Sequence, residues 1–103
     1  MRRGTIVHYA MGSQRLRAVI LTADRYNPAK SVVAPMRERD APELAPVFLV
    51  PVGRRDWPRP AMIDLSRMRR MDPSAVMGEA GQLTEPTLAS LGVAVRTYLG
   101  AYD

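Results

Sequence analysis

The sequence contains no cysteine, and among its 103 residues it has only one histidine, His8, and one lysine, Lys30. Without cysteine there are no disulfides and no cysteine-ligated metal sites, and a single histidine argues against a histidine-rich metal site. No segment approaches the ~18 consecutive apolar residues of a transmembrane helix, and the apolar stretch near the N-terminus is too short for a signal peptide. We therefore expect a cytoplasmic protein with no membrane segment and no metal.

Acidic residues are also scarce: 15 basic residues stand against 10 acidic ones, for a net charge of +5, and all the basic residues except Lys30 are arginine. The planar guanidinium suits phosphate and carboxylate, so this composition favours an anionic partner. A GC-rich genome would produce the same ratio of arginine to lysine. The 47% hydrophobic content suits a single compact domain over residues 1–103, small enough that dimerisation would usefully bury more surface.

Short apolar segments separated by turn residues predict several strands. They cover residues 6–11, 17–22, 31–36, 46–52, 61–65 and 67–71. Gly12-Ser13-Gln14 is a turn between the first two, and the second is apolar enough to be buried on both faces. Pro35 indicates an edge, a bulge or a strand end. Residues 24–30, 37–46 and 53–60 are predicted loops.

The last part of the chain changes period. Apolar residues recur at helical spacing at Leu88, Leu91, Val95 and Leu99, with Tyr98 beside them. Thr84 is a suitable N-cap with Glu85 in the first turn, and Gly100 is a suitable stop. Several strands followed by one helix predict a mainly β protein, a small twisted β-barrel packed by a C-terminal helix.

Arg17 stands at the head of an apolar strand after a tight turn. There its guanidinium can meet a phosphate and stabilise the extra charge of a phosphoryl transition state. The alternative is an exposed arginine flanking a strand. His8 suits general acid–base catalysis because imidazole titrates near neutral pH, although histidines within strands are more often structural.

Six further arginines are clustered, and one tryptophan lies among them. The arginines are Arg54, Arg55, Arg59, Arg67, Arg69 and Arg70, and Trp57 lies within the first group. Cations that hold phosphates and a ring that stacks a base are what single-stranded nucleic acid binding requires. A solvated loop with the tryptophan partly tucked in is the alternative.

Six segments, in order along nearly the whole chain, resemble motifs of one toxin family. Arg3-Gly4-Thr5-Ile6-Val7 resembles an Arg-Gly-Asp-Ile-Val opening, and Arg17-Ala18-Val19-Ile20 resembles an Arg-Pro-Val-Val strand. The other matches are Gly12-Ser13-Gln14 (a shortened Gly-Ser-Glu-Gln loop) and residues 32–37, 66–72 and 81–84. Together they resemble the MazF/PemK toxins of type II toxin–antitoxin systems, within the MazF/CcdB superfamily.

The resemblance implies a small β-barrel with a C-terminal helix, a homodimer, and metal-independent cleavage of single-stranded RNA without a cofactor, restrained by a cognate antitoxin. It places Arg17 on the family's catalytic arginine, and Arg37 on its catalytic threonine. Because an arginine cannot serve as a hydroxyl, either Arg37 takes another role, Ser13 or Thr22 substitutes, or cleavage is lost.

The expected catalytic residues are thus Arg17 and Arg37. The expected RNA-binding residues are Ser13, Arg54, Arg55, Trp57, Arg69 and Arg70.

Two alternatives to a ribonuclease remain open. The short first loop also resembles CcdB, a relative on the same fold that poisons DNA gyrase. CcdB-type poisoning relies on a C-terminal Trp-Gly-Ile, whereas this chain ends Leu99-Gly100-Ala101-Tyr102-Asp103. The other alternative is a basic binding module that has lost toxicity.

Overall fold

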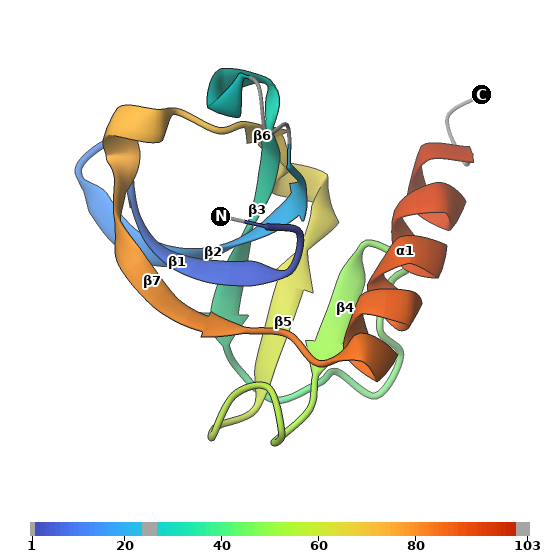
Figure 1. Ribbon diagram of the computed structural model, residues 1–103. Helices are drawn as coiled ribbons and strands as arrows, with labels where there is room; N and C mark the ends of the chain where they lie inside the picture. The colour runs from blue at the N-terminus through green and yellow to red at the C-terminus, as the bar shows by residue number, and fades with distance from the viewer. Residues whose placement is uncertain (1, 24–26, 101–103) are drawn as a thin grey trace.

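The computed structural model describes residues 2–23 and 27–100. The described chain forms seven strands and one α-helix (Figure 1). These are β1 (Thr5–Met11), β2 (Gln14–Thr22), β3 (Val32–Glu38), β4 (Leu49–Val52), β5 (Ala61–Asp64), β6 (Arg69–Arg70), β7 (Val76–Gln82) and α1 (Glu85–Gly100). Residues 24–26 of the predicted loop over 24–30 lie outside the described residues.

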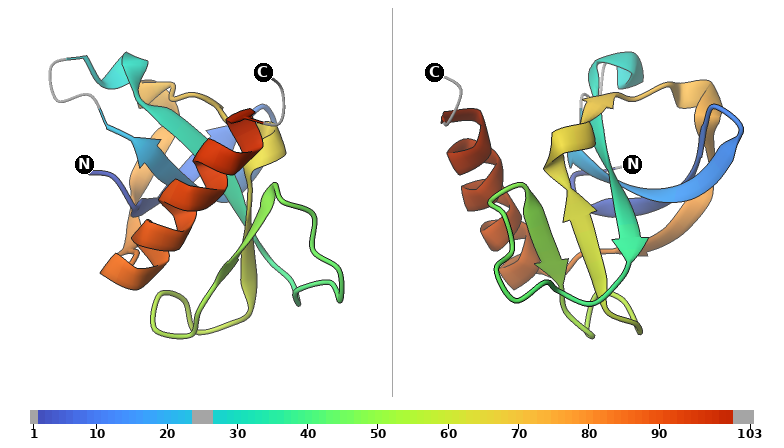
Figure 2. Two further views of the ribbon diagram at one scale, coloured as in Figure 1. Left: turned by 90° about the vertical axis from the view of Figure 1, so that its right-hand side faces the viewer. Right: turned by 180° about the vertical axis from the view of Figure 1, so that it is seen from behind.

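All the strands belong to one antiparallel sheet in the order β4-β5-β3-β2-β1-β7, with β6 also paired to β3. This confirms the predicted mainly β fold with a terminal helix. The sheet curls as in a small barrel, but it is not closed, because β4 and β7 do not pair. The chain passes from β7 directly into α1, which packs beside β4 at one end of the molecule while β1, β2 and β7 curl at the other (Figure 2).

The middle of β2 is buried on both faces, as predicted. Val19 packs in the larger apolar core, which lies between the sheet and α1. Its neighbours Ala18 and Ile20 point the other way, into a smaller core with Val33 and Met71. Alternate residues of a strand point to opposite faces, so a continuous apolar run is what a strand covered on both sides needs.

Four of the predicted strands need a boundary moved by two or more residues, and the other differences are of one residue. The second strand begins earlier, at Gln14, the third extends to Glu38, and the fourth begins only at Leu49. The strand predicted over 67–71 shrinks to Arg69–Arg70, because Asp64 caps a 3₁₀ turn over Leu65–Arg67.

Pro35 lies inside β3 and not at an edge or strand end. It is paired with Ala18 of β2 on one side. On the other side β3 pairs with β6 at residues 32–33 and with β5 at residues 36–38, so Pro35 falls in the interval between these two partners. This interval tolerates a residue that has no N–H to donate.

Strand β7 was not predicted from the sequence. Its two glycines, Gly78 and Gly81, and the charged Glu79 break the apolar alternation by which a strand is recognised. The strand forms because it completes the antiparallel ladder beside β1. Tertiary pairing therefore overrides a weak local preference.

Helix α1 begins after Thr84 and ends at Gly100, as predicted. Leu88 and Leu91 are buried, and Val95 and Tyr98 pack against the same core. Leu99 is a correction, because it is 53% exposed. In the described part of the chain, no helix is long and apolar enough to cross a membrane.

Candidate functional site

Three polar side chains from neighbouring strands, those of His8, Arg17 and Glu38, lie on one face of the sheet. Arg17 of β2 is directly opposite His8 of β1 on one side and Met36 of β3 on the other. Directly opposed residues of an antiparallel sheet share a face. Glu38 is two residues beyond Met36 and therefore lies on this face as well. Neighbouring strands thus bring together residues that are distant in sequence.

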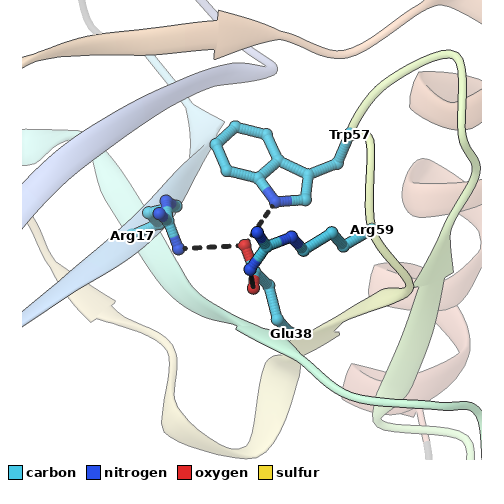
Figure 3. A network of polar contacts seen from close by, with 4 residues as sticks. All are labelled: Arg17, Glu38, Trp57 and Arg59. Atoms are coloured by element: carbon cyan, nitrogen blue, oxygen red, sulfur yellow. Dashed lines mark hydrogen bonds and ion pairs between the residues drawn. The ribbon is translucent and has the colours of Figure 1, made fainter.

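The loop between β4 and β5 adds Trp57 and Arg59 to this face (Figure 3). Trp57 Nε1 donates a hydrogen bond of 2.9 Å to Glu38 Oε1, and Arg17 Nη1 lies 3.3 Å from the same oxygen. Arg59 Nη1 lies 3.5 Å from Glu38 Oε2. The Arg17 guanidinium also stacks over the Trp57 ring, 4.8 Å from its centre. One carboxylate therefore organises three donor side chains.

Arg17 is held in place but retains unused donors. Its side chain is 39% exposed, so solvent and a ligand can reach it. Its Nε is buried and has no hydrogen-bond acceptor among the described residues. Since the Nε–H is buried and Nη1 is engaged with Glu38, the remaining Nη donors of the guanidinium are the ones that can bind an anion such as a phosphate.

The environment of Glu38 keeps it ionised. The hydrogen bond from Trp57 is the largest cause and lowers the pKa of Glu38 below its usual 4.5. Burial acts in the opposite direction, and the charges of Arg17 and Arg59 lower the pKa further. At neutral pH Glu38 is therefore an anion.

An open groove of about 410 Å³ lies beside Arg17. It is lined by His8, Tyr9, Arg15, Leu16, Arg17 and Met77. The residue opposite His8 on β7 is Gly78, which has no side chain and has open space where a Cβ would stand. Its φ of +140° favours glycine at this position. The groove is thus an open approach to His8 and Arg17.

Arg37 lies away from this site. It is exposed and is opposite Met62 on β5, and it alternates with Met36 and Glu38 along β3. The alternation of a strand puts its side chain on the face opposite to that of Arg17. The structure brings Glu38, not Arg37, beside Arg17.

The other predicted RNA-binding residues are distributed around the sheet. Ser13 is in the turn between β1 and β2, about 13 Å along the strand from Arg17 at ~3.3 Å per residue. Arg69 and Arg70 pair with Val33 and Val32 at the far end of β3. None of these three joins the Arg17 cluster.

Within the loop between β4 and β5, only part of the predicted basic cluster reaches the site. Arg54 and Arg55 are exposed, whereas Trp57 is partly buried and packs against the larger core. Arg17 already occupies one side of the Trp57 ring.

Sequence reasoning missed Glu38 and Asp56. Asp56 Oδ1 accepts a 2.5 Å hydrogen bond from the Thr84 N–H, and Oδ2 accepts one of 2.6 Å from the Thr87 hydroxyl. Asp56 thereby fastens the loop that carries Trp57 to the start of α1. The alternation of side chains along β3 could have indicated Glu38. No local motif connects Asp56 with Thr84 and Thr87, which follow it by 28 and 31 positions.

Over residues 2–23 and 27–100, no group of three or more His, Asp or Glu side chains is arranged to hold a metal ion. The site therefore consists of hydrogen-bond donors, a carboxylate and an imidazole.

No protein-family model matches the chain, and no curated protein matches it in sequence. Solved structures match it in fold. A mycobacterial endoribonuclease in complex with its cognate antitoxin has a TM-score of 0.76 and 18% identity, over 97% of this chain and 95% of that chain. The Mycobacterium tuberculosis toxin MazF-mt6 has a TM-score of 0.73 and 18% identity, over 92% of this chain and 96% of that chain.

A third match is MazF from Deinococcus radiodurans, with a TM-score of 0.74 and 18% identity over 97% of this chain and 96% of that chain. The molecule is therefore a small antiparallel β protein in which Arg17 lies beside an open groove. Its fold is that of the MazF toxins, which confirms at the level of the fold the resemblance seen in the sequence motifs.

Proposed function

We propose that this chain is the toxin of a toxin–antitoxin system and an endoribonuclease that cleaves single-stranded RNA without a metal ion. The fold it shares with MazF toxins over nearly its whole length supports this proposal. The observation that carries it is Arg17, which Glu38 holds beside an open groove with its side chain 39% exposed. We place this activity in the cytoplasm.

The reaction that fits the site is attack of a 2′-OH on the adjacent phosphate. This attack creates a phosphorane with additional negative charge, which the Arg17 guanidinium would stabilise. Arg37 would not replace the threonine of the family, because it lies on the other face of the sheet. Arg37→Ala should accordingly slow cleavage much less than Arg17→Ala.

We further propose that the RNA lies across the face that carries Arg17. Arg54 and Arg55 in the neighbouring exposed loop would bind flanking phosphates, and a base would contact Trp57 only if Arg17 shifted from its ring. Contacts of Ser13, Arg69 and Arg70 with RNA would require a strand that extends well beyond the Arg17 cluster. A cognate antitoxin and a second copy of the chain are the proposed protein partners.

The test is incubation of the purified protein with a long single-stranded RNA in EDTA, followed by mapping of the cut ends. Wild type should cut at discrete positions, and Arg17→Ala should be slower by about 10²–10³-fold, the usual effect of removing one donor to a transition-state oxyanion. Arg96→Ala is the matched control, because Arg96 is an exposed arginine on α1 and carries the same charge.

Intact RNA after incubation with wild type, or cleavage only when Mg²⁺ is added, would contradict the proposal. A toxin that binds a protein target would then be the better hypothesis. A gyrase supercoiling assay would follow, together with a test for growth arrest with intact RNA.

A further inference from the structure

The proposed reaction requires two proton transfers that arginine does not perform. The 2′-OH must lose a proton as its oxygen bonds to phosphorus, and the 5′-oxygen must gain one as its bond to phosphorus breaks. An arginine stays charged in proteins and is therefore a poor proton shuttle. The site therefore needs a separate base and a separate acid next to Arg17.

Glu38 has the properties of the base. It is an anion at neutral pH, and its Oε1 is occupied by Trp57 and Arg17. Among the residues that the structure describes, its Oε2 has the long 3.5 Å contact with Arg59 alone, and the side chain of Arg59 is 76% exposed. A carboxylate oxygen has two lone pairs, so Oε2 can accept a hydrogen bond from a ribose hydroxyl. The fixed Oε1 contacts hold the carboxylate in one orientation while Oε2 remains available.

His8 has the position of the acid. It is exposed, it is the direct cross-strand neighbour of Arg17 on the side away from β3, and both residues line the same groove. A phosphate bound by Arg17 would therefore have Glu38 on one side and His8 on the other. In-line displacement requires this arrangement, because the attacking and leaving oxygens lie on opposite sides of phosphorus.

We propose that Glu38 is the general base and His8 the general acid of this site, an inference that rests on the proposed function. Glu38 Oε2 takes the proton of the 2′-OH as the bond from the 2′-oxygen to phosphorus forms. His8 gives its proton to the 5′-oxygen as the bond from phosphorus to that oxygen breaks. The products are a 2′,3′-cyclic phosphate and a free 5′-OH, and solvent returns the proton from Glu38 to His8.

The charged groups that line the groove with His8 are Arg15 and Arg17 of β2. Glu79 of β7 is paired with Val7 and therefore lies on the opposite face of the sheet. The cleavage rate should rise with pH as Glu38 ionises.

The decisive experiment uses two short RNA oligonucleotides that span a mapped cut site. One is ordinary RNA, and the other has sulfur in place of the 5′-oxygen of the scissile bond. A thiolate leaves without being protonated, so cleavage of the sulfur substrate needs a base but no acid. His8→Gln should cut ordinary RNA about 100-fold more slowly and cut the sulfur substrate at the wild-type rate. Glu38→Gln should slow both substrates by about 100-fold.

Each other outcome overturns a stated part of the proposal. If His8→Gln cuts ordinary RNA at the wild-type rate, or slows both substrates equally, His8 is not the acid. If Glu38→Gln leaves the rates unchanged, Glu38 is not the base. If wild type cuts neither substrate, the proposed function fails and this inference fails with it. The fluorescence of Trp57 and the melting temperature of each variant check that the site is still folded.

Discussion

Asp56 should stabilise the folded protein more than Asp40, a loop carboxylate that is exposed. It accepts two short hydrogen bonds, from the Thr84 N–H and the Thr87 hydroxyl, at the first turn of α1. Removal of a capping side chain costs about 0.5–2 kcal/mol, and a hydrogen bond to a charged group contributes about 1.5–3 kcal/mol. The two contacts overlap in effect, so we expect Asp56→Ala to lower the free energy of unfolding by about 2 kcal/mol. For a chain of this size this is a fall in Tm of about 10 °C.

The effect should depend on pH with a definite sign. Burial raises the pKa of Asp56, but the hydrogen bonds from Thr84 and Thr87 outweigh it and lower the pKa below the usual 3.8. A carboxyl whose pKa is lower in the folded state stabilises that state above its unfolded pKa, and this contribution is lost as the pH falls through the folded value. The difference between wild type and Asp56→Ala should therefore be complete at pH 7 and shrink below about pH 4.

Urea denaturation at one fixed protein concentration measures the difference. Asp40→Ala is the matched control, because Asp40 is an exposed loop carboxylate, and its substitution should change stability by less than about 0.5 kcal/mol. If Asp56→Ala shifts the urea midpoint no more than Asp40→Ala does, with an unchanged m-value, the capping argument is refuted.

Two further predictions concern the core and the site. Leu91 of α1 is 1% exposed and packs in the larger core. Leu91→Ala should therefore lower the free energy of unfolding by about 2–5 kcal/mol in the same urea assay. A loss below about 1 kcal/mol would contradict the packing described. Trp57 is the only tryptophan, and its Nε1 donates to ionised Glu38. Its fluorescence should stay constant from pH 8 to pH 5 and change only below the usual glutamate pKa of 4.5, as Glu38 becomes protonated. Glu38→Gln should abolish that transition, and a transition that persists in the variant would exclude Glu38 as its origin.

Much of the local structure follows directly from the residues. The turn at Gly12-Ser13 joins β1 to β2, and Gly12 has the φ of +63° that such turns use. The spacing of Leu88 and Leu91 and the position of Thr84 determine the helix and the face that it buries. The apolar run from Ala18 to Leu21 required cover on both faces, and the two cores supply it. These features depend on residues that are close together in the chain.

The sequence by itself determined that the chain forms a β protein with one terminal helix, and that Arg17 stands at the start of a buried strand segment. Only the tertiary structure decided that the sheet stays open and that β7 is a strand, since both depend on pairing between distant segments. It also decided that Glu38 and His8 flank Arg17 while Arg37 does not. A shift of one residue along a strand moves a side chain to the other face of the sheet. Which side chains become neighbours therefore depends on the register between strands, and this register is set only in the folded sheet.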